Sequence, residues 1–181
     1  MNGFVLFASP WWVNLLILIP PAVFLWFRHP GLKLSGPQLA YSALFALAFG
    51  FVEAAVVVYL RVVTGLLSGG APEILAGLPA RMIFVELFRE GATLIMLLGV
   101  ALLSAPKARE RAAVFLWTFA FWDIFYYIWL RLTIGWPGSL TTPDVLFLLP
   151  VPWLAQVWFP LLVSLLAAMA VLSSIKSFRI K

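Results

Sequence analysis

The sequence predicts an all-α integral membrane protein with five transmembrane helices: one N-terminal helix followed by a tandem, parallel repeat of two-helix units. Three observations lead to this prediction. The 181 residues are 64% hydrophobic and only 10% charged, whereas a soluble domain carries about 25% charged residues. Five apolar segments are long enough to cross a bilayer, which takes about 20 residues per helix. Two of these segments also carry the same residues, and one matched acid pair, at a constant offset.

The match joins residues 45–65 to residues 115–135 at a constant offset of 70 positions. Glu53 meets Asp123, and Arg61 meets Arg131. Apolar segments resemble each other by chance, but a matched acid and a matched arginine do not follow from apolar composition. We therefore predict a duplication within a single membrane domain, 1–181, with repeat A at 38–103 and repeat B at 112–173. Five further positions carry the same residue in both segments: Phe45, Phe49, Phe51, Leu60 and Gly65.

The first transmembrane helix is predicted at 11–27. Ser9 and Pro10 form a favourable start, with Ser9 as N-cap and Pro10 at the first helical position. Pro20 and Pro21 are expected to kink this helix, because proline removes a backbone hydrogen bond. The segment before it has neither a basic stretch nor an A-x-A-like cleavage site. This favours a retained helix over a cleaved signal peptide.

Each repeat is predicted to contain two transmembrane helices, at 38–64 and 81–103 in repeat A and at 112–134 and 153–173 in repeat B. Gly65 and its counterpart Gly135 are expected to end the first helix of each repeat as C-caps. The segments 66–80 and 136–152 are expected to be corresponding long loops. A short interfacial helix starting at Pro72 fits the first of them.

Basic residues predict the orientation of the chain. With five spans, the loop after the first helix, the loop 105–111 and the C-terminal tail all lie on one side of the membrane. The positive-inside rule places that side in the cytoplasm. The sequence thus predicts a protein of a bacterial-type inner membrane, with its N-terminus outside and its C-terminus in the cytoplasm. The basic residues of the three segments are Arg28, Lys33, Lys107, Arg109, Arg111, Lys176, Arg179 and Lys181.

Ionisable residues inside the predicted spans define a candidate binding and ion-coupling site. A charge in the hydrocarbon core is costly, so these residues are expected to face the bundle interior and to pair. Glu53 and Asp123 lie about 16 Å below the outer ends of their helices, and Glu90 about 13 Å. Glu86 and Glu90 share a helix face at i and i+4, so an arginine, a proton or a cation is expected between them. The site residues are Glu53, Glu86, Arg89, Glu90 and Asp123, flanked by Arg61 and Arg131.

The same residues also allow structural roles. Arg61 and Arg131 could extend to the outer interface or pair with Glu73 and Asp144. The charged residues on the second helix of repeat A could form an ion-pair network that closes the outer face. This cluster is one-sided, since its counterparts in repeat B are Val157, Pro160 and Leu161.

The composition limits the chemistry of the chain. There is no cysteine, which excludes thiolate catalysis and cysteine-ligated zinc or iron–sulfur centres. The single histidine, His29, lies in a basic loop, so no haem is expected from this chain alone. The net charge of +5 comes from basic residues beside apolar spans. We therefore expect the lipid bilayer, and not nucleic acid, as partner.

Three functions fit these observations. The first is proton- or cation-linked transport of a small solute, because midplane carboxylates on repeat-related helices are typical of coupled carriers. A chain this small is then expected to form a homo-oligomer. The second is an accessory, non-catalytic subunit of a larger membrane complex, whose charges pair with those of a partner. The third is an intramembrane enzyme acting on a lipid-type substrate, with the carboxylates as metal ligands or as acid and base. The motifs H-E-x-x-H, G-x-S-x-G and D-D-x-x-D are absent from the sequence, which favours a non-enzymatic function.

Overall fold

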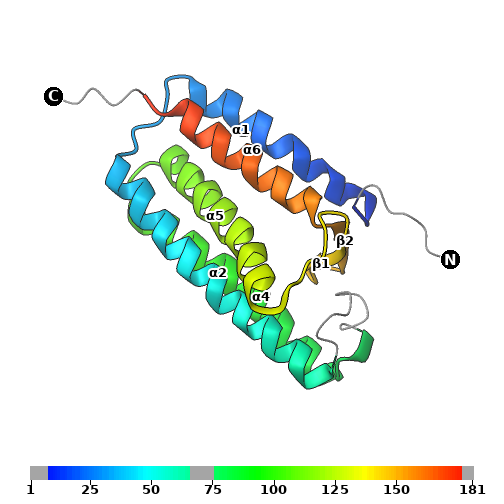
Figure 1. Ribbon diagram of the computed structural model, residues 1–181. Coiled ribbons are helices and arrows are strands. Elements are labelled where there is room, and N and C mark those ends of the chain that lie inside the picture. Colours follow the sequence, from blue (N-terminus) through cyan, green and yellow to red (C-terminus); the bar gives the residue numbers. More distant parts are fainter. Residues whose placement is uncertain (1–7, 66–75, 177–181) are drawn as a thin grey trace.

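The structure is a computed structural model that describes residues 8–65 and 76–176, and these residues form an elongated helical bundle (Figure 1). A 3-10 helix, η1 (Trp11–Leu18), continues directly into the first α-helix. The helix α5 is central: it packs against α2, α4 and α6, while α1 packs on α6. The five α-helices of the described residues are α1 (Ile19–Arg28), α2 (Gly36–Thr64), α4 (Ala80–Ser104), α5 (Ala108–Ile134) and α6 (Trp158–Ser174).

Four helical segments of the described residues are long and apolar enough to cross a membrane: Trp11–Arg28, α2, α4 and α5. This supports a polytopic membrane protein. The helix α6 has 17 residues and is shorter than these spans. The fifth span predicted at 153–173 is divided, because its first residues are extended and the helix begins only at Trp158.

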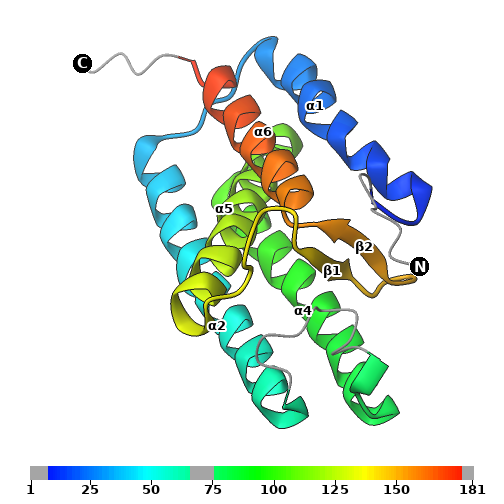
Figure 2. The ribbon, with the colours of Figure 1, turned by 45° about the vertical axis from the view of Figure 1, so that its right-hand side comes forward.

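The segment predicted as the loop 136–152 contains a strand, so the fold is not purely α-helical. Strand β1 (Pro143–Phe147) pairs antiparallel with β2 (Trp153–Gln156), and a bulge precedes Phe147. Ser9 extends this hairpin, since its backbone N–H and C=O each make a 2.7 Å hydrogen bond to Leu154. Figure 2 shows the hairpin between α6 and α4. An isolated two-stranded hairpin is marginally stable, and here the surrounding helices support it.

The start of the first helix also differs from the prediction. Ser9 belongs to the hairpin, and Pro10 holds the N-cap position of η1 without a side-chain hydrogen bond. Pro20 and Pro21 do not kink a continuous α-helix. They lie in the first turn of α1, directly after η1. The N–H groups of a first turn have no partner within the helix, so prolines are tolerated there.

The ends of α2 and α5 agree with the prediction. Gly65 and Gly135 follow these helices in the left-handed conformation, with φ of 70° and 71°. Glycine adopts this conformation without a steric penalty, which makes it the usual C-cap. At its other end, α2 begins with a capping box between Ser35 and Gln38. The interfacial helix expected from Pro72 falls on residues outside the described part of the chain.

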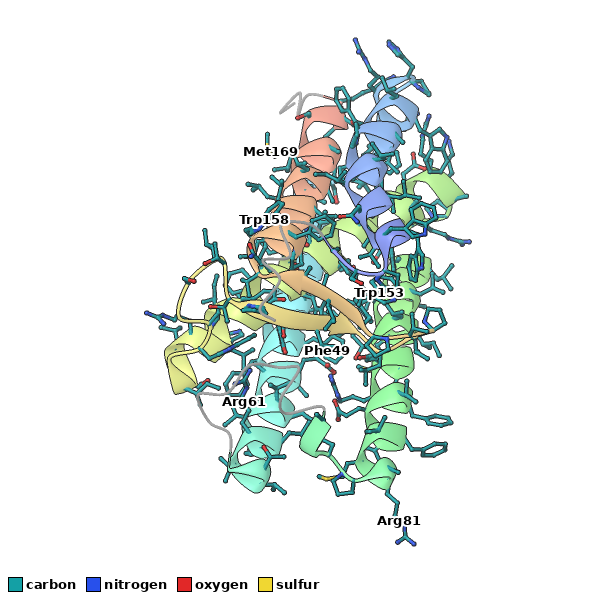
Figure 3. All side chains as sticks on the ribbon, turned by 90° about the vertical axis from the view of Figure 1, so that its right-hand side faces the viewer. Phe49, Arg61, Arg81, Trp153, Trp158 and Met169 are labelled. Atoms are coloured by element: carbon teal, nitrogen blue, oxygen red, sulfur yellow. The ribbon has the colours of Figure 1, made fainter. Side chains whose placement is uncertain are left out.

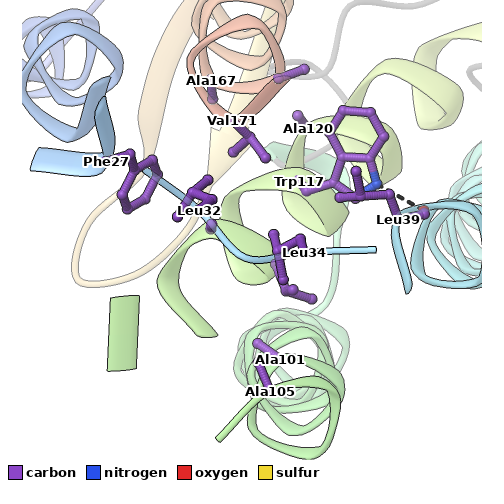
Figure 4. Close-up of a cluster of buried hydrophobic side chains, with 13 residues drawn as sticks. Phe27, Leu32, Leu34, Leu39, Ala101, Ala105, Trp117, Ala120, Ala167 and Val171 are labelled. Carbon is purple, nitrogen blue, oxygen red and sulfur yellow. Dashed lines mark hydrogen bonds between the residues drawn. The ribbon is translucent and has the colours of Figure 1, made fainter. Parts of the chain in front are cut away.

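One end of the bundle gathers the segments that carry most basic residues. Leu32, which follows α1, pairs with Ile175 at the end of α6. Arg109 at the start of α5 donates a 3.2 Å hydrogen bond to the carbonyl of His29. The connection after α1, the α4–α5 connection and the end of α6 therefore lie together. Buried hydrophobic side chains hold this end, among them Phe27, Leu34, Ala101, Trp117 and Val171 (Figure 4).

Candidate functional site

Arg89 of α4 is the centre of the charged cluster. Its guanidinium forms an ion pair with Glu53 of α2 and a second one with Glu86, whose Oε2 lies 2.9 Å from Nε and 2.7 Å from Nη2. Both carboxylates are buried, so each needs a partner for its charge. An arginine therefore lies beside Glu86, as expected, but its second ion pair is with Glu53 and not with Glu90.

Glu90 lies one helical turn after Glu86 and has a different partner. Both of its oxygens accept the backbone N–H of Leu148, at 3.0 Å and 2.8 Å. Leu148 directly follows β1, so these hydrogen bonds connect the hairpin to α4. A backbone N–H that donates to a carboxylate makes a charge-assisted hydrogen bond, which is stronger than a neutral one.

Glu53 and Asp123, the two acids that match in sequence, each accept a hydrogen bond from a hydroxyl side chain. Thr93 Oγ1 of α4 donates to Glu53 Oε1 at 2.9 Å, and Ser164 Oγ of α6 donates to Asp123 Oδ2 at 2.8 Å. The acids are 70 positions apart and the hydroxyl residues 71, and the sequence block 72–79 also matches 143–150 at an offset of 71. Sequence analysis missed both hydroxyl residues. The same offset, applied to serine and threonine as well as to charged residues, would have found them.

Arg61 and Arg131, which match in sequence, lie in different environments. Arg61 is only 1% exposed, and its guanidinium carbon lies 4.2 Å from the centre of the Trp136 ring. Figure 3 labels Arg61 on α2. Arg131 is exposed and donates hydrogen bonds to the carbonyls of Gly135 and Pro137. Arg61 is therefore part of the buried polar region, whereas Arg131 contacts the loop after α5.

Asp144 of β1 is a buried acid that sequence analysis named only as a partner for arginine. The Tyr127 hydroxyl donates to its Oδ2 at 2.7 Å, and the Val145 N–H donates to its Oδ1 at 2.8 Å. Burial raises the pKa of Asp144 to about 6, while the hydrogen bond from Tyr127 and the positive charge of Arg61 act in the opposite direction. The other suggested arginine partner, Glu73, lies outside the described residues.

A cavity of about 340 Å³ lies among η1, the helices α1, α2, α4, α5 and α6, and the hairpin. A second cavity of about 90 Å³ lies beside it and includes Arg61 and Glu86 in its lining. The residues that border both cavities are Arg89, Glu90, Tyr126, Asp144 and Val145. All five predicted site residues line one cavity or the other, and Arg131 lines neither of them. The acids at the larger cavity are Glu53, Glu90, Asp123 and Asp144.

Asp123 differs from the other acids of the larger cavity in its partners. Each of the others accepts a hydrogen bond from Arg89 or from a backbone N–H. Asp123 is 8% exposed, and Ser164 is its one hydrogen-bond partner in the described part of the chain. A buried carboxylate in this position is stable when it holds a proton or when a cation lies beside it.

Residues 8–65 and 76–176 contain no group of three or more His, Asp or Glu side chains arranged to hold a metal ion. The metal-binding form of the enzyme hypothesis therefore gains no support from the geometry of these residues. No protein-family model, curated protein or solved structure matches the chain. A functional conclusion accordingly depends on the chemistry of the site itself.

Proposed function

We propose that this polytopic membrane protein links the movement of a proton or another cation to the transport of a small solute. The proposed binding and ion-coupling residues are Glu53, Glu86, Arg89, Glu90 and Asp123. The observation that carries the proposal is Asp123. It is a buried carboxylate on the central helix, it lines the larger cavity, and the described residues place no cation beside it.

Asp123 suits this function because its charge state depends on what the cavity contains. An ionised carboxylate in apolar surroundings is costly, so a proton or a cation is favoured beside it. The Ser164 hydroxyl can donate to the ionised carboxylate and can accept from the protonated one. The same hydrogen bond therefore serves both states of Asp123.

The two cavities share polar lining residues that lead from Asp123 toward the C-terminal end of α2 and the N-terminal end of α4. Arg89 and Glu90 border both cavities, and the smaller cavity continues to Arg61 and Glu86. Arg61 lies in the last turn of α2, so the connection approaches the end of that helix. Chains of Asp and Glu side chains inside a helical bundle serve as proton relays in membrane pumps and transporters. This arrangement supports a proton or cation route in the outer half of the bundle.

The orientation and the duplication belong to the same proposal. The basic segments lie at one end of the bundle, which supports a cytoplasmic location for that end under the positive-inside rule. The matched pairs Glu53–Thr93 and Asp123–Ser164 support a tandem repeat. We also propose that the protein forms a homo-oligomer or a complex with other membrane proteins. The mass of the particle purified in mild detergent tests this proposal.

Proton uptake by proteoliposomes tests the proposed function. A pH-sensitive dye is enclosed in the vesicles, and an outside-acid pH step is applied together with a potassium diffusion potential. A mixture of small organic solutes is present on both sides of the membrane, because a coupled carrier moves protons together with its solute. Wild-type protein should acidify the lumen faster than protein-free vesicles do. Asp123→Asn should reduce the rate to that of protein-free vesicles, because asparagine keeps the shape of the side chain but cannot take up a proton.

Glu110→Gln is the matched control. Glu110 is also a buried acid of α5, at 3% exposure, but it lies in the first turn of the helix and lines neither cavity. This variant should acidify the lumen at the wild-type rate. Equal rates for wild type and folded Asp123→Asn would contradict the proposed function.

A further inference from the structure

We propose that the larger cavity binds a hydrophobic organic cation, with its ammonium group against Asp123 and its apolar body against an aromatic wall. This solute class rests on the proposed function, since the same cavity takes the solute. It narrows "small solute" to amines and quaternary ammonium compounds that carry an aromatic or aliphatic group.

The charges at the cavity favour a cation over an anion. Carboxylates outnumber basic side chains on its lining, where Arg89 is the one basic residue among those described. The Arg89 guanidinium is already bound to Glu53 and Glu86. An anionic ligand would therefore meet carboxylates without gaining a cation of its own. A cationic ligand would neutralise Asp123, the acid at this cavity without a cation or a backbone N–H beside it in the described residues.

Aromatic rings form the wall next to Asp123. Phe119, Trp122 and Phe147 all line the cavity. The ring centroid of Phe119 lies 5.4 Å from that of Trp122 and 6.5 Å from that of Phe147, and the last two lie 6.4 Å apart. Phe119 lies one helical turn before Asp123 and so shares its face of α5. Trp153 of the hairpin also lines the cavity, and its ring centroid lies 5.3 Å from that of Phe147. Figure 3 labels Trp153 at the hairpin. The faces of aromatic rings attract ammonium groups within about 6 Å, which is how proteins enclose quaternary ammonium ligands.

The size and lining of the cavity suit an organic cation better than a metal ion. Its volume of about 340 Å³ falls within the range of about 300–1,000 Å³ found for small-molecule pockets. A hard metal ion requires several oxygen ligands, and the described residues offer no such group. Leu16, Ile19 and Leu94 also line the cavity and provide apolar surface for the body of the ligand.

Benzyltrimethylammonium and benzylsulfonate are matched probes for this inference. Both join a phenylmethyl group to a tetrahedral headgroup, and they differ in the sign of the charge. Each probe is titrated into the purified full-length protein in detergent, with isothermal calorimetry and tryptophan fluorescence as readouts. The ammonium probe should bind to the wild-type protein, and the sulfonate probe should not.

Variants separate the contributions of charge and of aromatic rings. Asp123→Asn should weaken binding of the ammonium probe by roughly tenfold or more. Phe119→Leu keeps the Asp123 carboxylate and should weaken binding of the ammonium probe by roughly two- to tenfold. Glu110→Gln should bind the probe as the wild type does. If Asp123→Asn does not fold, the affinity of Phe119→Leu and the comparison of the two probes still test whether the cavity binds an organic cation.

The outcomes separate this inference from the proposed function. Equal binding of both probes, or unchanged ammonium affinity in Phe119→Leu and folded Asp123→Asn, would overturn the inference. Proton uptake that depends on Asp123, together with no binding of the ammonium probe, would overturn it while supporting the proposed function. Binding of the ammonium probe that depends on Asp123, together with no proton uptake, would support the ligand class and contradict the transport function.

Discussion

At the scale of single residues, Arg89 neutralises two buried carboxylates from different helices. Glu53 belongs to α2 and Glu86 to α4, and both pair with the same guanidinium. Thr93 binds the other oxygen of Glu53. Both α2 and α4 pack mainly on α5 and make little contact with each other elsewhere. We therefore expect this ion pair to hold the two helices in register.

Replacing Arg89 should destabilise the protein strongly. Arg89→Met keeps most of the side-chain volume but leaves two buried carboxylates without their cation, which should lower the free energy of unfolding by about 3–5 kcal/mol. Unfolding in mixed micelles with increasing dodecyl sulfate measures this. Arg81→Met is the control, because Arg81 is exposed at the start of α4 and should change the free energy by about 0.5 kcal/mol or less. Equal stability of the two variants would contradict this role for Arg89.

Asp144 should make the stability of the protein depend on pH. Its pKa is about 6 in the folded protein against an ordinary value of 3.8, so the folded state binds a proton more tightly than the unfolded state does. Its contribution to stability is therefore complete below the unfolded pKa and is lost as the pH rises through the folded pKa. The difference between the two pKa values corresponds to about 3 kcal/mol in the free energy of unfolding.

A comparison with Asp144→Asn isolates this contribution from those of the other acids. Free energies of unfolding are measured at about pH 4.5 and about pH 7.5. The wild type should gain more stability on acidification than the variant, because asparagine does not titrate. An equal gain in both proteins would show that Asp144 does not titrate in this range.

At the scale of helices, α2 and α5 pack closely because Gly50 has no side chain. A Cβ atom at this position would lie 2.9 Å from the carbonyl oxygen of Trp122 and 3.2 Å from the backbone nitrogen of Tyr126. Both are backbone atoms of α5, so they move only if the helix moves. Small residues at intervals of four allow close helix packing in membranes. The buried small residues of α2 are Ser42, Ala46, Gly50 and Ala54.

Gly50→Ala should therefore weaken the packing of α2 on α5. Inserting the methyl group should cost about 1–3 kcal/mol in free energy of unfolding, measured as for the arginine variants. Gly99→Ala is the matched control, because a Cβ there meets nothing within 4 Å and alanine favours the helix by about 1 kcal/mol. If the two alanine variants have the same free energy of unfolding, the close contact at Gly50 does not control the packing of α2 on α5.

Helix ends that depend on local signals were predictable, and the hairpin was not. Gly65 and Gly135 end their helices where the sequence places them, because a left-handed C-cap needs only the glycine itself. The residues of β2 were assigned to a helix. The periodicity of a short apolar segment fits a strand as well as a helix. Its extended form depends on pairing with β1 and with Ser9, which the periodicity does not reveal.

At the scale of the whole molecule, the orientation in the membrane can be tested with single cysteines, because the natural sequence has none. Lys107→Cys and Ser139→Cys place exposed thiols before and after α5. A membrane-impermeant maleimide should label Ser139→Cys in intact cells and Lys107→Cys only after permeabilisation. The reverse pattern would contradict an outside N-terminus, and labelling of both in intact cells would contradict the crossing of the membrane by α5.

The sequence by itself determined that the chain enters a membrane, which of its helices end at glycine, and which acids and arginines lie inside the spans. These properties follow from composition and from local chemistry. The tertiary structure decided the partners: Arg89 binds Glu53, Arg61 is buried while Arg131 is exposed, and Asp123 retains only Ser164 in the described residues. The physical reason is that a buried charge is stabilised by whatever a neighbouring helix brings to it. That neighbour is set by packing between segments far apart in the chain.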